Sequence, residues 1–301
     1  MDGLLIIDKP EGITSHDVVN RVRRVLGTRR VGHTGTLDPF ATGVMVVVVG
    51  KATRLAQFLD KDEKEYEAVV RFGFETDTGD RTGVDSGRWT VDSESVAKTL
   101  NSVNWSAVLE EFTGRQEQLP PMYSAKKIDG KKLYESARKG IEIERKAVPV
   151  TIRELEVRNS TIKDPRSTIG LRVVCSAGTY IRVLAEDIGK KIGVGAHLAQ
   201  LRRTRSGRFK IDESVTLDRL AAAEDPSSYL LPIDEAVSHL DAFSLDATRA
   251  EATANGLSTR VGDCSFTEGQ TLRLLGPDGA LLAIGIFNPE DNSIRPKVVL
   301  V

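Results

Sequence analysis

Two continuously apolar runs stand out in the first fifty residues, at 3–7 and at 44–49. Runs of this length, bounded by glycine or charged residues, predict buried strands. Between them several valines keep near-helical spacing, with Ser15 placed to cap a helix and Gly27 placed just beyond its end. The N-terminal part is therefore expected to begin as strand, helix and strand.

Alternating apolar positions follow in residues 64–73, where Tyr66, Ala68, Val70 and Phe72 share one face of a predicted strand. Residues 74–90 are rich in Gly, Asp, Thr and Ser and predict a loop. The pattern further predicts helices near 52–59, 93–102, 105–113, 181–188 and 195–203, and strands at 149–158 and 168–176.

After Pro232 the pattern changes to short apolar runs separated by Gly and Asp, which predicts a small β module. We expect an α+β catalytic domain over residues 1–238, with a lysine-rich insertion at about 118–148. A small β-rich domain is expected over 239–301.

The composition, 40% apolar and 28% charged residues, is ordinary for a globular protein. No run approaches the ~20 apolar residues of a membrane span, and the N-terminus does not resemble a signal peptide. Cys175 and Cys264 lie far apart, which argues against a disulfide framework and against a zinc site. We therefore expect a cytoplasmic protein with no metal and no membrane partner.

The net charge of −1 conceals three basic segments. Residues 126–146 hold eight Lys or Arg against four acids, while 200–210 and 21–30 each hold five basic residues and no acid. Residues 212–235, by contrast, hold seven acids and one arginine. Basic charge gathered in separate segments of a near-neutral protein favours a polyanionic partner, and we expect nucleic acid.

The segment 32–43 is the strongest candidate for chemistry. It contains Gly32, Gly35 and Gly43, and it places Asp38 immediately before Pro39. Glycines permit close approach of a ligand, and proline restricts the residue before it to extended geometry. Asp38 is thus predicted to be a carboxylate held on a stiff loop beside a buried strand.

Six blocks of sequence, in order over about residues 3–232, resemble the tRNA pseudouridine-55 synthase family. The blocks are Asp8–Ser15, Gly32–Gly43, Lys64-x-Tyr66, Pro120–Ala125, Gly178–Arg182 and His197–Thr204. The resemblance implies a pseudouridine synthase fold, which is a mixed, largely antiparallel sheet with flanking helices, followed by a small β module like the one associated with these enzymes. It also implies isomerisation of uridine 55 in the T-loop of tRNA, with no cofactor.

The resemblance assigns roles residue by residue. Asp38 matches the catalytic aspartate, expected to be the nucleophile, and Arg182 the arginine paired with it. Tyr66 matches the aromatic residue that stacks on the uracil and is a possible base; Tyr180 and Leu201 match pocket residues, and His33 a histidine at the RNA. Lys9 is expected to shape the turn beside the loop. The expected contacts to the RNA backbone are Lys126, Lys127, Lys131, Lys132, Arg202, Arg203, Arg205 and Arg208.

The reaction requires a carboxylate for reasons independent of the resemblance. It breaks the C1′–N1 bond, turns the uracil and forms a C1′–C5 bond. A carboxylate can add to an electrophilic carbon or stabilise positive charge on the sugar. The sequence leaves open whether Asp38 attacks the base, attacks the sugar or assists elimination at C2′. The target uridine must also leave its stack, because C1′ and C5 are hidden inside it.

Three other interpretations compete with this one. A glycosylase would use the same carboxylate to release free uracil, although no second carboxylate stands out to activate water. A binding protein or RNA chaperone would need no chemistry, and a guide-RNA-dependent relative would need further components. The basic insertion favours an enzyme that acts alone, and we expect a monomer with tRNA as its partner and no obligate protein partner.

Overall fold

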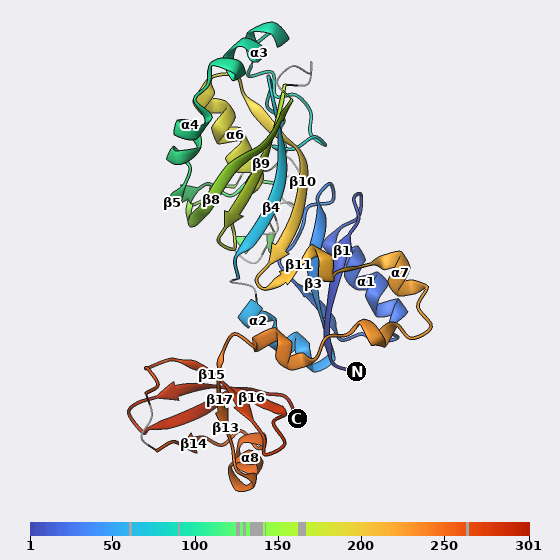
Figure 1. Ribbon diagram of the computed structural model, residues 1–301, viewed down its shortest axis with the longest axis vertical. Coiled ribbons are helices and arrows are strands. Elements are labelled where there is room, and N and C mark those ends of the chain that lie inside the picture. The colour runs from blue at the N-terminus through green and yellow to red at the C-terminus, as the bar shows by residue number, and fades with distance from the viewer. Residues whose placement is uncertain are drawn as a thin grey trace.

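The computed structural model describes residues 1–59, 62–89, 91–124, 127–128, 131–132, 141, 143–161, 167–262 and 265–301. Among these residues, no helix is both long and apolar enough to cross a membrane. The chain forms an upper part built on one large sheet and a lower part built on a small one (Figure 1).

Within the described residues, the large sheet has ten strands, with the main order β12-β1-β3-β10-β4-β9-β8-β5 and with β2 on β3 and β11 on β10. The strands are β1 Gly3–Lys9, β2 Val31–Thr34, β3 Thr42–Val49, β4 Lys64–Phe72, β5 Gly114–Gln118, β8 Val148–Thr161, β9 Thr168–Cys175, β10 Ala196–Ser206, β11 Phe209–Lys210 and β12 Val215–Thr216. Among the strand pairs described in this sheet, β1–β12 and β3–β10 are parallel and the others are antiparallel. The expected mixed, largely antiparallel sheet is confirmed.

The β3–β10 pair joins the two halves of this sheet and is only two residues long, Arg202 with Thr42 and Arg203 with Gly43. The loop between β2 and β3 lies at this junction, because Gly43 is the second residue of β3. The candidate loop that carries Asp38 is therefore placed where the two halves of the sheet meet.

Helices cover one face of the β10–β4–β9 part of the sheet (Figure 1). The helices of this half are α3 Ser93–Ser102, α4 Trp105–Glu111 and α6 Ile181–Ile192. Ile181, Leu184 and Ile188 of α6 are buried in the same core cluster as Val70 and Phe72 of β4, as the apolar spacing predicted. The other face of these strands carries charged side chains.

Helix α1 runs from Ser15 to Val25, but its cap differs from the prediction. Thr14 is the N-cap: its hydroxyl accepts a hydrogen bond from the Asp17 N–H, and the Asp17 carboxylate accepts from the Thr14 N–H. The predicted cap, Ser15, is buried, and its Oγ lies 2.8 Å from the Leu37 nitrogen and 3.0 Å from the Leu37 oxygen. Ser15 therefore joins α1 to the Asp38 loop.

The predicted helix at 195–203 is wrong, because Ala196–Ser206 is strand β10. A register shift between Leu198 and Gln200 displaces the alternation by one residue, so that Leu198 and Leu201 both face the core. The resulting three-residue spacing imitates a helix. Short helical segments continue the chain elsewhere in this half: η1 Gly50–Leu55, α2 Ala56–Leu59, η2 Ile211–Glu213, α7 Leu217–Ala221, η3 Pro226–Tyr229 and η4 Ile233–Val237.

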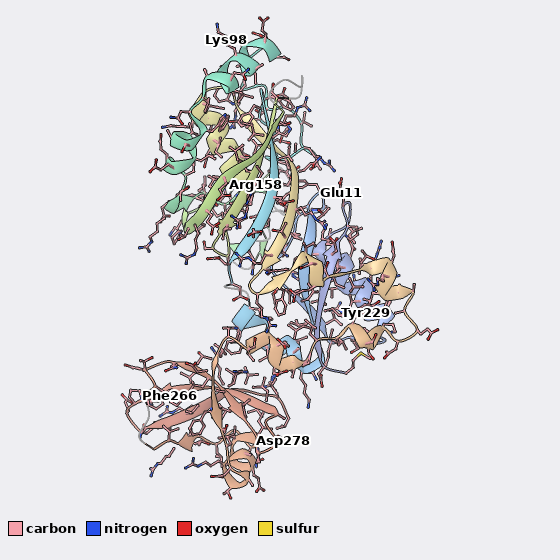
Figure 2. All side chains as sticks on the ribbon, viewed as in Figure 1. Glu11, Lys98, Arg158, Tyr229, Phe266 and Asp278 are labelled. Carbon is pink, nitrogen blue, oxygen red and sulfur yellow. The ribbon has the colours of Figure 1, made fainter. Side chains whose placement is uncertain are left out.

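The small sheet has the order β13-β15-β16-β17-β14. Its elements are β13 Asp241–Ser244, α8 Ala247–Ala254, β14 Thr259–Arg260, β15 Thr271–Leu275, β16 Leu281–Asn288 and β17 Ser293–Val299, and Figure 2 labels Phe266 and Asp278 between them. Ile284, Val298 and Leu300 share a core cluster with Leu55 and Leu59 of the large half. The expected C-terminal β module is present, and its division from the rest at residue 238 stays a prediction.

Candidate active site

The Asp38 loop is held in place by a buried lysine. Lys9 is fully buried, and its Nζ donates hydrogen bonds to the carbonyls of Pro10 (2.9 Å), Pro39 (3.2 Å) and Ala41 (2.7 Å). Burial lowers the pKa of Lys9 to about 8, although nearby Asp38 opposes this. Two of these carbonyls belong to the residues that follow Asp38, so the expected structural role of Lys9 is confirmed.

Asp38 forms the predicted ion pair with Arg182. Arg182 Nε lies 2.9 Å from Asp38 Oδ2, and a second guanidinium nitrogen donates to Oδ1 at 3.3 Å. The guanidinium also donates to the carbonyls of Thr78 and Tyr123, each at 2.7 Å. Four contacts therefore fix a side chain that is only 4% exposed, and the guanidinium presents its charge to Asp38 in one orientation.

The Asp38 carboxyl is in an environment with opposing effects. Burial raises its pKa, while the Arg182 guanidinium lowers it and the neighbouring Asp80 carboxylate raises it again. A third of the Asp38 side chain is nevertheless exposed. The carboxyl is thus both anchored and accessible to a ligand.

Asp80 is a buried acid of this site that the sequence did not indicate. Its Oδ1 accepts hydrogen bonds from the Thr82 N–H (2.9 Å) and the Thr78 hydroxyl (3.0 Å), and its Oδ2 lies 3.9 Å from Arg182. The surrounding segment has only the composition of a loop, so no local pattern marks Asp80. Its position depends on the bridge between Asp80 and Leu198 of β10.

A cavity of about 280 Å³ opens beside the ion pair, at the small end of the range for ligand pockets. It is lined by residues from five segments of the chain, namely Gly35, Thr36, Leu37, Asp38, Lys64, Tyr66, Ser124, Ala177, Gly178, Thr179, Tyr180, Ile181, Arg182, Leu201 and Arg203. Five of the predicted catalytic and pocket residues therefore meet in one cavity, namely Asp38, Tyr66, Tyr180, Arg182 and Leu201, and Arg203, predicted as an RNA contact, lines it too. His33 is not part of this lining.

Two tyrosines line the cavity at different depths. Tyr66 is 8% exposed, and burial raises the pKa of its phenol although Arg203 opposes this. Tyr180 is the N-cap residue of α6, and its N–H donates to Gln118 Oε1 at 2.9 Å. Burial raises the pKa of Tyr180 as well. Both phenols therefore stay protonated near neutral pH and offer ring faces or hydroxyl groups to a ligand.

Comparisons with known proteins agree with this arrangement. A family profile described as "TruB family pseudouridylate synthase (N terminal domain)" matches residues 23–181, and one described as "tRNA pseudouridylate synthase B C-terminal domain" matches residues 182–238. The chain belongs to the TruB family of pseudouridylate synthases. The resemblance seen in the sequence is confirmed.

Relatives cover the whole chain. A protein of Bacillus pumilus named tRNA pseudouridine synthase B is 40% identical over 308 residues, which cover 100% of this chain and 98% of that protein. One of Aromatoleum aromaticum with the same name is 46% identical over 258 residues, covering 85% of this chain and 80% of that protein. A crystal structure of a Cbf5-Nop10-Gar1 complex contains a chain 27% identical to this one, with a TM-score of 0.72, covering 99% of this chain and 85% of that chain.

Arg203 is buried and is not available at the surface as a phosphate contact. Its side chain is 1% exposed, and the guanidinium donates to the carbonyls of Val44 (2.6 Å) and Gly35 (3.0 Å). A Cβ on Gly43, whose φ is +104°, would lie 2.2 Å from the Arg203 carbonyl oxygen. The predicted phosphate contact is therefore wrong for Arg203, which instead braces the Asp38 loop.

The other arginines of β10 and its turn are occupied. Arg202 contacts both carboxylate oxygens of Asp8, at 3.1 and 2.8 Å. Arg205 lies 3.3 Å from Glu63, and Arg208 pairs with Glu235. Their contact with RNA stays a prediction, and it would require these pairs to exchange or share their carboxylates.

The remaining predicted RNA contacts are less completely described. Lys126 lies outside the described residues, and only the backbone is described for Lys127 in β6, Lys127–Ile128, and for Lys131 and Lys132 in β7, Lys131–Lys132. His33 lies in β2, where burial lowers its pKa and, among the described residues, its Nδ1 has no hydrogen-bond partner. Its contact with RNA also stays a prediction.

Proposed function

We propose that this TruB-family protein converts uridine 55 in the T-loop of tRNA to pseudouridine, without a cofactor. The observation that carries the proposal is the Arg182–Asp38 pair at the wall of a cavity that also contains Tyr66, Tyr180 and Leu201. The assignment of tRNA as the substrate rests on the names of relatives that are 40% identical over the full chain.

The geometry suits a uridine turned out of its stack. The ring faces of Tyr66 and Tyr180 and the side chain of Leu201 offer apolar contact to the uracil, which offsets part of the few kcal/mol needed to unstack it. Asp38, held at its two oxygens by Arg182, is then the carboxylate next to the glycosidic bond. From this position the carboxylate can add to the base, add to the sugar or assist elimination at C2′.

Arg182 is assigned to keep Asp38 ionised when RNA displaces water from the site. Burial raises the pKa of Asp38 in the free protein, and the guanidinium is the largest opposing influence. Tyr66 is assigned to stacking in the first place, since its raised pKa keeps the phenol protonated before the reaction begins. A role for Tyr66 as a base would come only after the uracil has been released from C1′.

The proposal is tested with a T-arm hairpin carrying tritium at C5 of its uridines. The protein alone is expected to release the tritium of uridine 55 from this hairpin and to leave the mass of an unlabelled hairpin unchanged. Asp38→Asn is expected to lower the rate by at least about 10⁴-fold while the hairpin still binds. Asp246→Asn, in the C-terminal module, serves as the matched control.

Several outcomes would contradict the proposal. Turnover by Asp38→Asn near the wild-type rate would remove Asp38 from the chemistry. Free uracil among the products would indicate a glycosylase. Release of tritium from a hairpin in which uridine 55 is replaced by cytidine would move the reaction to another uridine.

A further inference from the structure

The basic segment 21–30 differs from the segment 200–210 in that four of its five arginines are exposed and have no carboxylate partner among the described residues. Arg21, Arg24, Arg29 and Arg30 are all exposed. Across the part of the chain that the structure describes, no carboxylate lies within 4.0 Å of any of these four guanidinium groups. We call these four residues the α1–β2 arginine surface. In β10, by contrast, each arginine is buried or already paired.

The fold itself turns these arginines outward. Val18, Val19 and Val22 of α1 are buried against the core, so Arg21 and Arg24 occupy the opposite side of the helix. Arg29 and Arg30 stand at the entry to β2, where the Arg30 carbonyl accepts a hydrogen bond from the Gly50 N–H at 2.7 Å. The favourable effect of positive charge at a helix C-terminus accounts for Arg24 but not for Arg29 or Arg30.

Neighbouring acids do not form ion pairs with this surface. Asp17 lies one turn before Arg21 in α1, and hydrogen bonds from Thr14 lower its pKa with a smaller contribution from Arg21, but the Asp17 and Arg21 side chains are not within 4.0 Å of each other. Helix α7, which carries Asp218, packs beside α1 (Figure 1). No described carboxylate of α7 nevertheless comes within ion-pair distance of the four arginines. Four guanidinium groups thus keep their charge available for a partner outside the chain.

The surface is joined rigidly to the candidate active site. Strand β2 leads from Arg30 directly to Gly35 on the cavity wall, a path of roughly 16 Å at strand rise. A second connection runs through Ser15 at the start of α1, whose Oγ is hydrogen-bonded to Leu37 of the Asp38 loop. We therefore expect an RNA arm that places one nucleotide in the cavity to extend to this surface.

We infer that the α1–β2 arginine surface binds phosphates of the RNA arm whose uridine enters the cavity, and that it does so in place of the occupied arginines of β10. The inference rests on the proposed function for the identity of the RNA. Guanidinium groups suit phosphate oxygens because they present several donors in one plane. Their unpaired state also means that binding breaks no ion pair of the protein.

The test is the salt dependence of RNA binding by the full-length protein. We compare the wild type with Arg24→Gln/Arg29→Gln, using a T-arm hairpin as the probe and filter binding from 0.05 to 0.3 M KCl. Each lost phosphate contact is expected to reduce the slope of log K against log[salt] by about 0.7–0.9, so the double variant loses about 1.4–1.8. At 0.1 M salt its affinity is expected to fall by up to about 60-fold.

The matched control is Lys98→Gln/Arg115→Gln, which removes one exposed charge from α3, where Figure 2 labels Lys98 far from α1, and one from the edge strand β5. The control is expected to keep the wild-type slope. The arginine variant is expected to raise KM for the hairpin and to leave kcat and the melting temperature unchanged. An unchanged slope, or the same loss in both variants, would overturn the inference and leave the surface to an acidic protein partner.

Failure of the proposed function would look different. If the wild type bound the hairpin but released no tritium from uridine 55, the proposed reaction would be wrong. The arginine surface would still be judged by its salt slope, because that measurement requires no turnover.

Discussion

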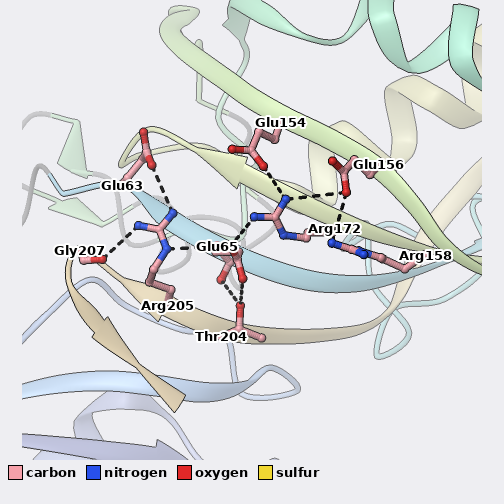
Figure 3. A network of polar contacts seen from close by, with 9 residues as sticks. All are labelled: Glu63, Glu65, Glu154, Glu156, Arg158, Arg172, Thr204, Arg205 and Gly207. Atoms are coloured by element: carbon pink, nitrogen blue, oxygen red, sulfur yellow. Dashed lines mark hydrogen bonds and ion pairs between the residues drawn. The ribbon is translucent and has the colours of Figure 1, made fainter. Parts of the chain in front are cut away.

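Two of the regions in which arginines contact carboxylates lie on opposite faces of the large sheet. At the cavity, Arg182 is 4% exposed and is held by two backbone carbonyls as well as by Asp38. On the open face, Arg172 is 22% exposed and lies 2.8 Å from Glu65, 2.5 Å from Glu154 and 3.8 Å from Glu156 (Figure 3).

The two regions differ in how many alternative polar partners each charged side chain has. On the open face, Glu65 also accepts from Thr204 at 2.8 Å and lies 3.9 Å from Arg205, so the loss of any one contact leaves others (Figure 3). Exposed pairs of this kind stabilise a protein by about 0–1 kcal/mol each. At the cavity one guanidinium contacts both oxygens of Asp38, with Asp80 at 3.9 Å, and its carbonyl partners fix its position. We therefore expect the loss of one contact to have a small effect on the open face and a large effect at the cavity.

The largest effect is expected from Arg182→Gln. Removing the guanidinium takes away the charge that lowers the pKa of Asp38, so this pKa rises further and the acid limb of kcat/KM moves to higher pH. We expect activity to fall by about 10³-fold at neutral pH. Arg182→Lys keeps a positive charge without the two-point contact to Asp38. Its activity is expected to lie between those of the wild type and Arg182→Gln. An acid limb at the wild-type position in Arg182→Gln would contradict the assigned role.

Lys9 is a second buried cation whose position is fixed by backbone carbonyls, and its effect on stability can be measured. Its pKa is about 8 in the folded protein, against about 10.4 in an unfolded chain. Between these values the unfolded state binds more protons, so the free energy of unfolding rises with pH, by up to about 1.4 kcal/mol per unit. The stability difference between the wild type and Lys9→Met is therefore expected to grow from pH 8 to pH 10 in urea titrations. A difference that stays constant over this range would contradict burial of a charged Lys9.

The smallest effect is expected from Arg172→Gln on the open face. Burial raises the pKa of Glu65, but hydrogen bonds from Thr204 and Arg172 more than offset this and lower it. Loss of Arg172 is expected to decrease the free energy of unfolding by less than about 1 kcal/mol at pH 7 and to leave kcat unchanged. A loss of stability above 3 kcal/mol, or a tenfold loss of activity, would show that the open face is as sensitive to the loss of one arginine as the cavity.

Much of the local structure was predictable from the sequence. The apolar runs at 3–7 and 44–49 became β1 and β3, and the inward residues of α6 were identified correctly. The cap of α1 was misplaced by one residue, and β10 was taken for a helix because its bulge shifts the alternation. Such errors arise where a single residue changes the phase of a periodic pattern.

The site was predictable in its members but not in their surroundings. Family motifs named Asp38, Tyr66, Tyr180, Arg182 and Leu201, and all five line one cavity. No motif indicated that Asp80 lies beside Arg182 or that Arg203 is buried against Val44. These contacts join residues more than one hundred positions apart, so they exist only once the sheet has closed.

The sequence by itself determined where charge stands along the chain, which segments are apolar and which residues carry the reaction's motifs. The tertiary structure alone decided which charges are free. Segments 21–30 and 200–210 each hold five basic residues, yet only the first leaves four arginines exposed without a carboxylate partner in the described chain. The physical reason is that periodicity and turn chemistry act over a few residues, whereas the partner of an arginine is set by the strand that comes to lie beside it.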